Sequence, residues 1–324
     1  MTMEVSVVIS TYNNRRILRP CLDAMLAQDF PASDFEIIVA DDGSADGTRG
    51  MVEAIRAPVA IRYTRQMNRG LAAARNLGTR AAGGRIVLFL DSDLWAGPGL
   101  LRAHHRHYPP GARGVAVQGR SITHPDARRT LFMRVREMSP DLTPRRHQRL
   151  SPLHVVGRNF SLLRGDLRAA GGFDEGFPGY GWEDVELAVR LNAHGVTIAY
   201  EPDALGYHYH AETLESMQRK WRENGKSAVY FWRKHGQPRA LGFFLEVAPA
   251  LRPLKWLVYR SALFTPLVRL TLPVAEARQW RLALSECYNH LLWKAYNDGV
   301  LEALREPVRT VRPGVVPPEA APWK

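Results

Sequence analysis

The sequence predicts an α/β protein with a mostly parallel sheet flanked by helices, followed by a helical C-terminal extension. Two observations predict the sheet. Apolar, β-branched runs alternate with segments of helical periodicity over the first hundred residues, and two of these runs end in paired carboxylates. Beyond residue 213 the chain changes to basic and aromatic segments, which predict the extension. The 324 residues, 45% of them hydrophobic, suffice for one large domain with an appendage.

Strand and helix patterns alternate in the first part of the chain. Residues 5–10 form a β-branched run typical of a buried strand, and apolar side chains at helical spacing over 17–26 place one helix face on the sheet. Residues 35–40 predict a second strand, 51–55 carry the helical pattern again, and 59–63 predict a short third strand. We therefore expect a right-handed parallel α/β unit here.

The apolar run at residues 86–90 follows Gly83 and Gly84 and predicts a strand buried on both faces. It ends in two carboxylates, Asp91 and Asp93. Ligands bind at the carboxyl ends of strands in open α/β sheets, and hard oxygens there suit Mg²⁺ or Mn²⁺ together with a substrate diphosphate. An Asp-rich turn gives the same pattern, so this motif alone leaves both interpretations open.

Composition and charge limit the class of protein. A net charge of +12 and a pI near 10.0 imply an anionic partner, which is nucleic acid, acidic lipid or a phosphorylated substrate. The sequence has no zinc-finger spacing or aromatic RNA-binding motif, so nucleic acid is not expected. Cys21 and Cys287 form no disulfide or zinc pattern and the N-terminus lacks the features of a secretory signal, so we expect a cytoplasmic protein.

Four segments of the first hundred residues together resemble the family 2 glycosyltransferases of GT-A fold, which have a Rossmann-type sheet. They are Ser-Val-Val-Ile-Ser-Thr-Tyr-Asn at 6–13, Val-Ala-Asp-Asp-Gly-Ser at 39–44, Asn-Arg-Gly-Leu-Ala-Ala-Ala-Arg-Asn at 68–76 and Leu-Asp-Ser-Asp at 90–93. The resemblance implies a nucleotide-sugar donor, with a UDP-sugar as the first expectation, and a Mn²⁺ or Mg²⁺ cofactor.

The resemblance also assigns roles to residues in these segments. It places Ser10, Tyr12 and Asp42 around the base and ribose, Asp91 near the ribose and diphosphate, and Asp93 on the metal. Their chemistry agrees, because a carboxylate accepts hydrogen bonds from base N–H or ribose hydroxyl groups and a tyrosine ring offers a stacking face. The alternative for Asp42 is a helix-capping residue.

The segment at 68–78 predicts a helix that approaches the sheet closely, because Ala72, Ala73 and Ala74 are small. Arg75 follows these alanines. Its guanidinium could reach a diphosphate, or it could be an ordinary surface arginine of the helix, and the sequence leaves both interpretations open.

A second group of chemically active residues lies at 171–187, where a loop rich in glycine and aromatic residues leads into Glu183 and Asp184. Carboxylates in a first helical turn are also favoured by the helix dipole and by capping. Gly-Trp-Glu-Asp at 181–184 resembles the acceptor-side motif of the inverting, galactosyltransferase-like members of the group. By that resemblance Asp184 is the catalytic base, Glu183 helps to orient the acceptor, and Trp182 gives a sugar-stacking face.

Two histidines, His208 and His210, follow the strand-like residues 198–202. The resemblance implies a histidine here that completes the metal site, and His208 matches best, with His210 as the alternative. Their alternation would put both on one face of a strand. Both could also be ordinary aromatic strand residues.

The remaining segments are basic. Residues 121–150 combine arginines with prolines, which indicates a surface excursion, either solvated or in contact with an anionic acceptor. The extension at 214–305 has no apolar span of ~20 residues, so no transmembrane helix is expected. Its helices would lie peripherally on an anionic membrane, contact a second subunit or pack on the catalytic domain, and we favour packing. In the first case the interfacial anchors are Trp221, Tyr230, Phe231 and Trp232, and in the packing case these residues form a core with Phe243, Phe244 and Trp256. The Pro-rich tail at 306–324 is expected to be disordered.

These observations predict a catalytic domain at 1–213, with a nucleotide-sugar-binding half at 1–120 and an acceptor-side half at 150–213. We expect a metal-dependent, inverting hexosyltransferase that acts on a hydroxyl group of a glycan, glycolipid or other cell-surface precursor. A nucleotidyltransferase is the nearest alternative, although residues 11–16 lack the glycine-rich phosphate loop that it would need. A basic binding module on a degenerate GT-A fold is the other alternative.

Overall fold

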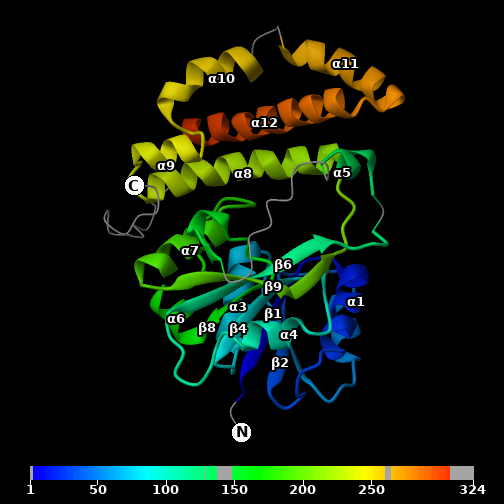
Figure 1. Ribbon diagram of the computed structural model, residues 1–324, viewed down its shortest axis with the longest axis vertical. Coiled ribbons are helices and arrows are strands. Elements are labelled where there is room, and N and C mark those ends of the chain that lie inside the picture. The colour runs from blue at the N-terminus through cyan, green and yellow to red at the C-terminus, as the bar shows by residue number, and fades with distance from the viewer. Residues whose placement is uncertain (1–2, 128, 137–147, 260–263, 307–324) are drawn as a thin grey trace.

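The computed structural model describes residues 3–127, 129–136, 148–259 and 264–306. Figure 1 shows a sheet domain that contains the N-terminus and, stacked above it, a layer of helices.

The described strands are β1 (Val5–Thr11), β2 (Phe35–Asp41), β3 (Ala60–Arg65), β4 (Ile86–Asp91), β5 (Leu94–Ala96), β6 (Val115–Thr123), β7 (Arg149–Leu150), β8 (Phe160–Leu163) and β9 (Thr197–His208). The described α-helices are α1 (Arg15–Leu26), α2 (Thr48–Glu53), α3 (Leu71–Ala81), α4 (Leu100–His105), α5 (Leu131–Arg136), α6 (Arg164–Ala169), α7 (Glu183–Ala193), α8 (Leu214–Lys234), α9 (Arg239–Phe244), α10 (Arg252–Tyr259), α11 (Phe264–Arg278) and α12 (Arg281–Arg305). Two short 3₁₀ turns are η1 (Pro152–His154) and η2 (Pro249–Leu251).

The strands form one mixed sheet in the order β3-β2-β1-β4-β8-β6-β9-β5, with β7 paired to β9. β3, β2, β1 and β4 run parallel, so the predicted parallel α/β unit is confirmed. β1 and β2 are buried along their whole length because helices cover both faces of this half of the sheet. The register pairs Ser10 with both Ala40 and Asp91, which brings three strand ends to one edge.

Two apolar cores lie on opposite faces of the sheet. One packs α1, α2 and α4 against it, and the other packs α3, α6 and α7. The predicted close approach of α3 is confirmed, since Ala73 is fully buried and a Cβ at Gly78 would overlap the side chain of Val8.

Strand β8 runs antiparallel to both of its neighbours, β4 and β6, which the sequence pattern did not predict. Residues 155–163 have the apolar composition of a strand, yet only Phe160–Leu163 form one. Asn159 has a positive φ of 55°, and its side-chain amide donates to the carbonyls of Arg120 at 3.0 Å and Ala204 at 2.7 Å. These bonds hold a turn before the strand begins.

Helices α8 and α12 form the middle of the helical layer, with α10 and α11 on the side of α12 away from the sheet (Figure 1). The two helices approach closely at two glycines. A Cβ at Gly225 would overlap the carbonyl of Tyr296, and a Cβ at Gly299 would overlap the carbonyl of Arg222. Within the described part of the chain, no helix is both long and apolar enough to cross a membrane.

The aromatic residues of α8 pack as predicted. Phe231 and Trp232 are buried in a core that α8 shares with α7, α9 and α12. Phe243 and Phe244, which were expected in the same core, instead remain exposed. The side chain of Trp256 lies outside the described residues. The packing interpretation therefore holds for α8 but not for the whole extension.

The basic stretch at 121–150 is not a simple surface excursion, so that prediction is wrong for its described part. Its first residues continue β6, and α5 buries Phe132, Met133 and Val135 against α11 and α12. One short apolar turn between arginines gave too little periodicity to be recognised. Residues 137–147 and the predicted tail from 307 onward lie outside the described residues.

Candidate active site

The carboxyl ends of β1 and β4 place Ser10, Tyr12 and Asp91 at the same edge of the sheet. Ser10 pairs with Asp91 in the parallel register, and its hydroxyl is buried without a hydrogen-bond partner among the described residues. Tyr12 follows β1 with 51% of its surface exposed. A hydroxyl available for bonding and an exposed ring beside a carboxylate are groups that can contact a nucleoside.

Asp42 holds the loop that leads into α3. Its Oδ1 accepts hydrogen bonds from Gln66 Nε2 at 2.8 Å and the Arg69 amide at 2.9 Å, and its Oδ2 accepts one from the Gly70 amide at 2.8 Å. The alternative of a cap on the following helix is wrong, because that helix begins only at Thr48. Of the roughly four acceptor positions of a carboxylate, about one remains for a nucleotide.

The antiparallel pairing of β5 with β9 sets Leu94 opposite His208 and so brings Asp93 to the same place. Asp93 Oδ2 lies 3.3 Å from His208 Nε2. The ring of His210 follows the end of β9, with its centroid 5.9 Å from that of His208. Burial raises the pKa of Asp93, but the hydrogen bond and positive charge of His208 outweigh burial and hold this pKa below its usual range.

Arg75 joins Asp91 at the end of β4 to Glu183 at the start of α7. Its side chain is buried, with Nη2 3.1 Å from Asp91 Oδ1 and Nη1 3.3 Å from Glu183 Oε1. The guanidinium carbon also lies 5.2 Å from the centre of the Phe173 ring. Burial lowers the pKa of Arg75, but the charges of Asp91 and Glu183 outweigh burial and raise it. The interpretation of Arg75 as a surface arginine is therefore wrong, and its reach toward a diphosphate stays a prediction.

Glu183 and Asp184 begin α7 but face different surroundings. Glu183 is 4% exposed, and its Oε2 has no hydrogen-bond partner among the described residues. Burial first, and the charge of Asp184 second, raise the pKa of Glu183 to about 7 although Arg75 opposes them. Asp184 is partly exposed, unlike Glu183, and its role as the catalytic base stays a prediction. Glu183 is buried, so any part that it has in orienting the acceptor stays a prediction.

Gly157 was not predicted as a site residue, yet it supports both charged groups. Its amide donates to Asp184 Oδ2 at 2.7 Å. A Cβ at this position would lie 2.6 Å from Arg75 Nη1, so a side chain would displace the guanidinium. One feature of the sequence could have indicated this role of Gly157. A glycine within an apolar run often marks a place where the backbone approaches another group closely.

Trp182 is held partly by the helical layer. It has a positive φ of 72°, following Gly181 at 91°, and these two left-handed residues turn the chain sharply into α7. Its ring centroid lies 5.9 Å from that of Phe244 and 6.3 Å from that of Phe231. These contacts fix the ring while leaving part of it exposed, and stacking of an acceptor sugar on it stays a prediction.

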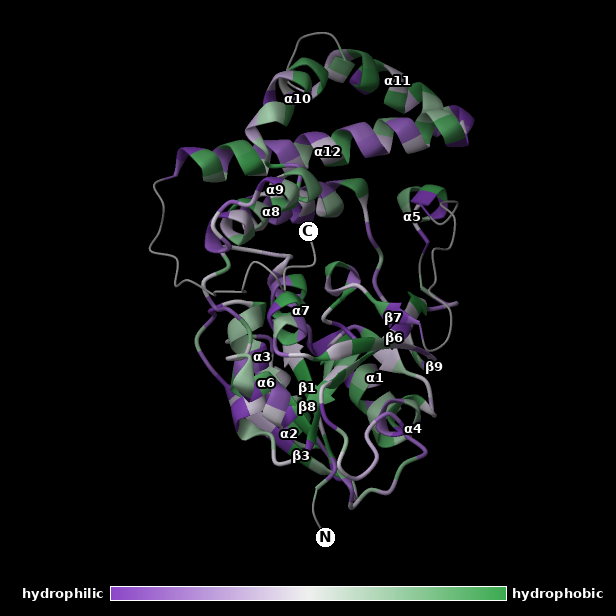
Figure 2. Ribbon diagram, turned by 60° about the vertical axis from the view of Figure 1, so that its left-hand side comes forward, coloured by the Kyte–Doolittle hydropathy of each residue, from purple (hydrophilic) through white to green (hydrophobic). Residues whose placement is uncertain are grey.

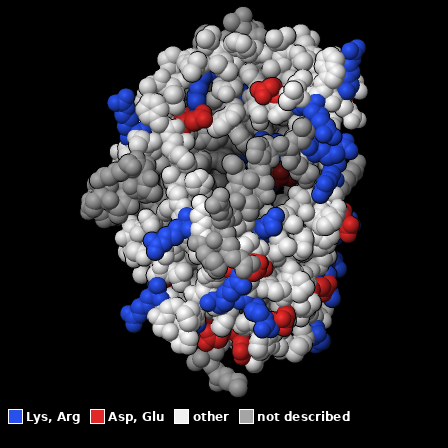
Figure 3. All heavy atoms as spheres, viewed as in Figure 1, with Lys and Arg blue, Asp and Glu red and all other residues white. Residues whose placement is uncertain are grey.

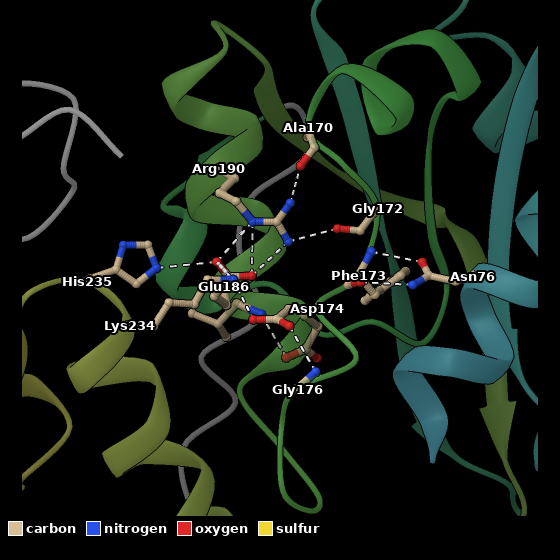
Figure 4. Close-up of polar contacts among 12 residues, drawn as sticks. Asn76, Ala170, Gly172, Phe173, Asp174, Gly176, Glu186, Arg190, Lys234 and His235 are labelled. Atoms are coloured by element: carbon tan, nitrogen blue, oxygen red, sulfur yellow. Dashed lines mark hydrogen bonds and ion pairs between the residues drawn. The ribbon is translucent and has the colours of Figure 1, made fainter. Parts of the chain in front are cut away.

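A polar cluster anchors α7 to the C-terminal helices (Figure 4). Glu186 Oε2 lies 2.7 Å from Arg190, and its Oε1 lies 2.8 Å from Lys234 Nζ and 3.3 Å from His235 Nε2. Lys234 Nζ also lies 2.6 Å from Asp174 Oδ2. Burial alone would raise the pKa of Glu186, but its hydrogen bonds with His235 and Arg190 hold it far below the usual range. The contacts of Glu186 with Lys234 and His235 could not be predicted from the sequence, because the partners lie on different elements. The pair of Glu186 with Arg190 lies within α7.

Asn76 joins α3 to the acceptor-side loop, as Figure 4 shows. Its Nδ2 donates to the Phe173 carbonyl at 2.8 Å, and its Oδ1 accepts from the Phe173 amide at 2.9 Å. The same Nδ2 lies 2.9 Å from Glu175 Oε1. Consecutive residues of α3, Arg75 and Asn76, therefore connect the two halves of the site.

Asp93 and His208 fit a divalent cation that takes its other ligands from a substrate. Adjacent ligands of an octahedral Mg²⁺ at ~2.1 Å lie ~3 Å apart, which is near the 3.3 Å between Asp93 Oδ2 and His208 Nε2. Among the described residues, no group of three or more His, Cys, Asp or Glu side chains could hold a metal ion by itself. Such ions usually keep one or two protein carboxylates and bind substrate phosphates, so a two-residue site is sufficient.

The mixed sheet and the site at the ends of β1 and β4 define a GT-A-type α/β protein. Residues 6–169 match the model of glycosyl transferase family 2, and residues 146–214 match a model described as the N-terminal domain of galactosyltransferase. The first match covers half of the chain, and the protein belongs to glycosyl transferase family 2.

Curated relatives are glycosyltransferases. Validoxylamine A glucosyltransferase of Streptomyces hygroscopicus subsp. jinggangensis is 33% identical over 231 residues, which cover 62% of this chain and 54% of the relative. The uncharacterized glycosyltransferase YfnE of Bacillus subtilis is 27% identical over 255 residues, which cover 64% of each protein. The chain thus spans about half to two thirds of the length of these relatives.

Solved structures share the fold. The mannosyltransferase PcManGT from Pyrobaculum calidifontis, in complex with GDP-Man and Mn²⁺, aligns with a TM-score of 0.62 at 20% identity, covering 94% of this chain and 89% of that chain. Residues 1–349 of Staphylococcus aureus TarS, in complex with UDP-GlcNAc, align with a TM-score of 0.53 at 18% identity, covering 95% and 93%. At these identities the likeness concerns the fold, and the predicted GT-A architecture is confirmed.

Proposed function

We propose that the protein is a metal-dependent, inverting glycosyltransferase that moves a hexose from a UDP-sugar to a hydroxyl group of a glycan or lipid-linked acceptor. One observation carries the proposal. Arg75 links Asp91 at the end of β4 to Glu183, whose neighbour Asp184 is accessible to an acceptor. A candidate donor site and a candidate base thus belong to one site. The nucleotide sugars bound to PcManGT and TarS support this assignment.

Asp184 acts as the general base in this proposal. Backbone amides of Gly157 and Val185 donate to its two oxygens at 2.7 and 2.8 Å, which fixes the carboxylate while leaving it accessible. Asp184 takes the proton of the acceptor hydroxyl, and the oxygen attacks the anomeric carbon from the face opposite the nucleotide. A positioned base typically contributes ~10²–10⁴-fold to the rate. Glu183 acts by positioning, through Arg75.

The donor side uses Ser10, Tyr12, Asp42 and Asp91. The exposed ring of Tyr12 would stack on the base, and the unpaired hydroxyl of Ser10 would bond to the nucleoside. Asp42 would use its remaining acceptor position and would also keep the loop before α3 in place. Asp91, oriented by Arg75, would accept from a ribose hydroxyl.

Asp93 and His208 would hold Mn²⁺ or Mg²⁺, with His210 as the alternative nitrogen ligand. When bound, the cation supplies charge stabilisation for the departing diphosphate without proton transfer. The 3.3 Å separation of the two side chains and the Mn²⁺ bound to PcManGT support a divalent ion.

We assign residues 1–213 to the catalytic domain, with a nucleotide-sugar-binding half at 1–120 and an acceptor-side half at 150–213. Residues 214–305 form the helical extension. The last described strand ends at His208 and α8 begins at Leu214, which supports this boundary. Lys234 of the extension forms an ion pair with Glu186 of α7. The extension therefore supports the acceptor side and is not an independent module.

The experiment is hydrolysis of a panel of UDP- and GDP-sugars by the full chain in the presence of Mn²⁺. We expect release of the nucleoside diphosphate from one donor class, and loss of that release in Asp93→Ala. Arg49→Ala, which changes an exposed residue of α2, is the control. Equal release by the wild type and Asp93→Ala would reject the assigned site.

A further inference from the structure

Helices α10 and α11 present large apolar side chains to solvent at helical spacing. On α11 the exposed residues are three, three and four positions apart, which places them on one face of the helix. Two exposed leucines of α10 lie three positions apart, so they too share one face. The exposed residues are Leu254 and Leu257 on α10, and Phe264, Leu267, Leu270 and Val274 on α11. We name this set the apolar face. Isolated exposed leucines are ordinary, whereas a stripe of them on adjacent helices marks an interaction surface.

The apolar face lies at the end of the molecule opposite the N-terminus. Figure 2 shows hydrophobic ribbon on α10 and α11 there, with α12 between these helices and the rest of the protein. α11 packs on α12 through a different set of residues, of which Thr265 and Ala275 are buried. The apolar face therefore is not the side by which the helix joins the fold.

Basic residues lie at the two ends of this pair of helices. Arg252 begins α10 and Arg278 ends α11, and both are exposed. The two helices contain a single acidic residue, Glu276, which accepts a hydrogen bond from Tyr288. In Figure 3 most side chains at this end are uncharged, with Lys and Arg on either side and a few acidic side chains between them. The half-exposed ring of Trp280 lies 5.1 Å from the guanidinium carbon of Arg278. Exposed leucines with arginines and a tryptophan are typical of helices that lie in a membrane interface.

We propose that the apolar face docks on an anionic lipid bilayer, with its leucines among the acyl chains and its arginines at the headgroups. The charge favours this occupant over a second copy of the chain, because two such surfaces would bring like charges together. It also favours lipid over nucleic acid, because nucleic acid would attract the arginines but leave Leu267 and Leu270 in water. Each basic residue near an anionic surface adds to the electrostatic attraction, which salt screens. The leucines add a hydrophobic contribution to the binding free energy, which salt does not screen.

This surface differs from the one that the sequence suggested. The aromatic residues of α8, which were the candidate interfacial anchors, are largely buried: Phe231 and Trp232 belong to a core. The leucines of α10 and α11 are exposed instead. Docking at this face would hold the enzyme at a membrane without occupying the candidate active site, which lies at the ends of β1 and β4. The inference therefore does not depend on the proposed transferase activity.

The test is flotation of the full chain with vesicles of phosphatidylcholine alone or with phosphatidylglycerol added. We expect binding to the anionic vesicles and at least about ten-fold weaker binding by the double variant Leu267→Ser, Leu270→Ser, which leaves the charge unchanged. These side chains are 61% and 75% exposed, so the fold should tolerate the change, as circular dichroism would verify. The matched control is Met67→Ser, an 83% exposed apolar residue of the sheet domain, which should bind like the wild type.

Three outcomes would overturn the proposal. One is that the wild type fails to bind anionic vesicles at low salt. Another is that the double variant binds them as well as the wild type, which would leave only a general attraction of a basic protein. The third is that the wild type is dimeric on size exclusion and the double variant monomeric, with no vesicle binding by either, which would assign the apolar face to a second copy of the chain.

Discussion

The ammonium nitrogen of Lys234 lies 2.8 Å from Glu186 Oε1, and both side chains are almost fully buried. Lys234 ends α8, whereas Glu186 lies in the first turn of α7, close to the candidate base Asp184. Burying an ion pair costs free energy because both charges lose water. Only close, well-oriented polar partners offset that cost, so the two side chains have to keep their geometry. This pair therefore holds the start of α7 in place relative to α8 and the helical extension.

Removing Lys234 should loosen the acceptor side without touching the donor site. Lys234→Met leaves the carboxylate of Glu186 with Arg190 and His235 but removes one buried partner, so we expect a loss of about 2–3 kcal/mol in the free energy of unfolding. Transfer to an acceptor should fall more than donor hydrolysis. Urea unfolding and the two activities measure this. In the control Lys294→Met, loss of the surface pair with Asp298 should cost less than 1 kcal/mol. Equal effects of the two variants would contradict the anchoring role.

Asp184→Asn should lower turnover by ~10²-fold or more while donor binding changes little. The amide keeps the size of the side chain and can still accept from the Gly157 amide, but it has no useful proton affinity. Steady-state transfer and calorimetric binding of the donor measure the two quantities. Comparable turnover in the variant and the wild type would move the base to another group.

Chelation should abolish turnover, and Mn²⁺ or Mg²⁺ should restore it. The same assay separates the two histidines. His208→Ala removes the side chain 3.3 Å from Asp93 and should raise the metal concentration needed for half-maximal activity by at least ten-fold. His210→Ala should change it less, and the reverse order would assign the site to His210. Full activity in excess chelator would reject a metal site altogether.

The pKa of Glu183 predicts a specific dependence of stability on pH. Because burial raises this pKa from 4.5 to about 7, the folded protein holds a proton that the unfolded chain releases. The resulting stability is fully present below about pH 4.5 and is lost as the pH rises through about 7. In Glu183→Gln this dependence should vanish, so the variant should gain roughly 2–3 kcal/mol relative to the wild type between pH 4.5 and 7. Urea unfolding at both pH values measures this, and a constant difference would contradict the prediction.

Gly299→Ala should destabilise the contact between α8 and α12 by about 1–3 kcal/mol, because the added Cβ overlaps the carbonyl of Arg222 and the backbone cannot move freely. The matched control is Gly50→Ala in α2, where no heavy atom lies within 4 Å of the new Cβ. That change should be neutral or stabilise by up to ~1 kcal/mol, since alanine favours the helix. Thermal unfolding compares the two. A Gly299→Ala protein as stable as the control would show that the helices separate without cost.

The sequence by itself predicted the parallel half of the sheet and the strand-end carboxylates. Hydrophobic periodicity and composition are properties of a short segment, so the buried strands β1, β2 and β4 could each be recognised from their own residues. The position of Asp91 and Asp93 at a strand end followed from the apolar run of β4 that precedes them. The pairing of Asp93 with His208 came from a family resemblance, and the strand register then brought the two together.

Only the tertiary structure decided the contacts between distant segments. Nothing local in residue 75 distinguishes a surface arginine from one buried between Asp91 and Glu183, because that difference depends on the partners folded around it. The same holds for Gly157, whose small size matters only because Arg75 and Asp184 approach it from two other elements. The helical extension also depends on contacts between distant segments. Helices α8 and α11 both carry apolar residues among arginines, so their sequences do not distinguish them. Because of how each helix packs against α12, α8 buries aromatic side chains, whereas α11 leaves leucines in solvent.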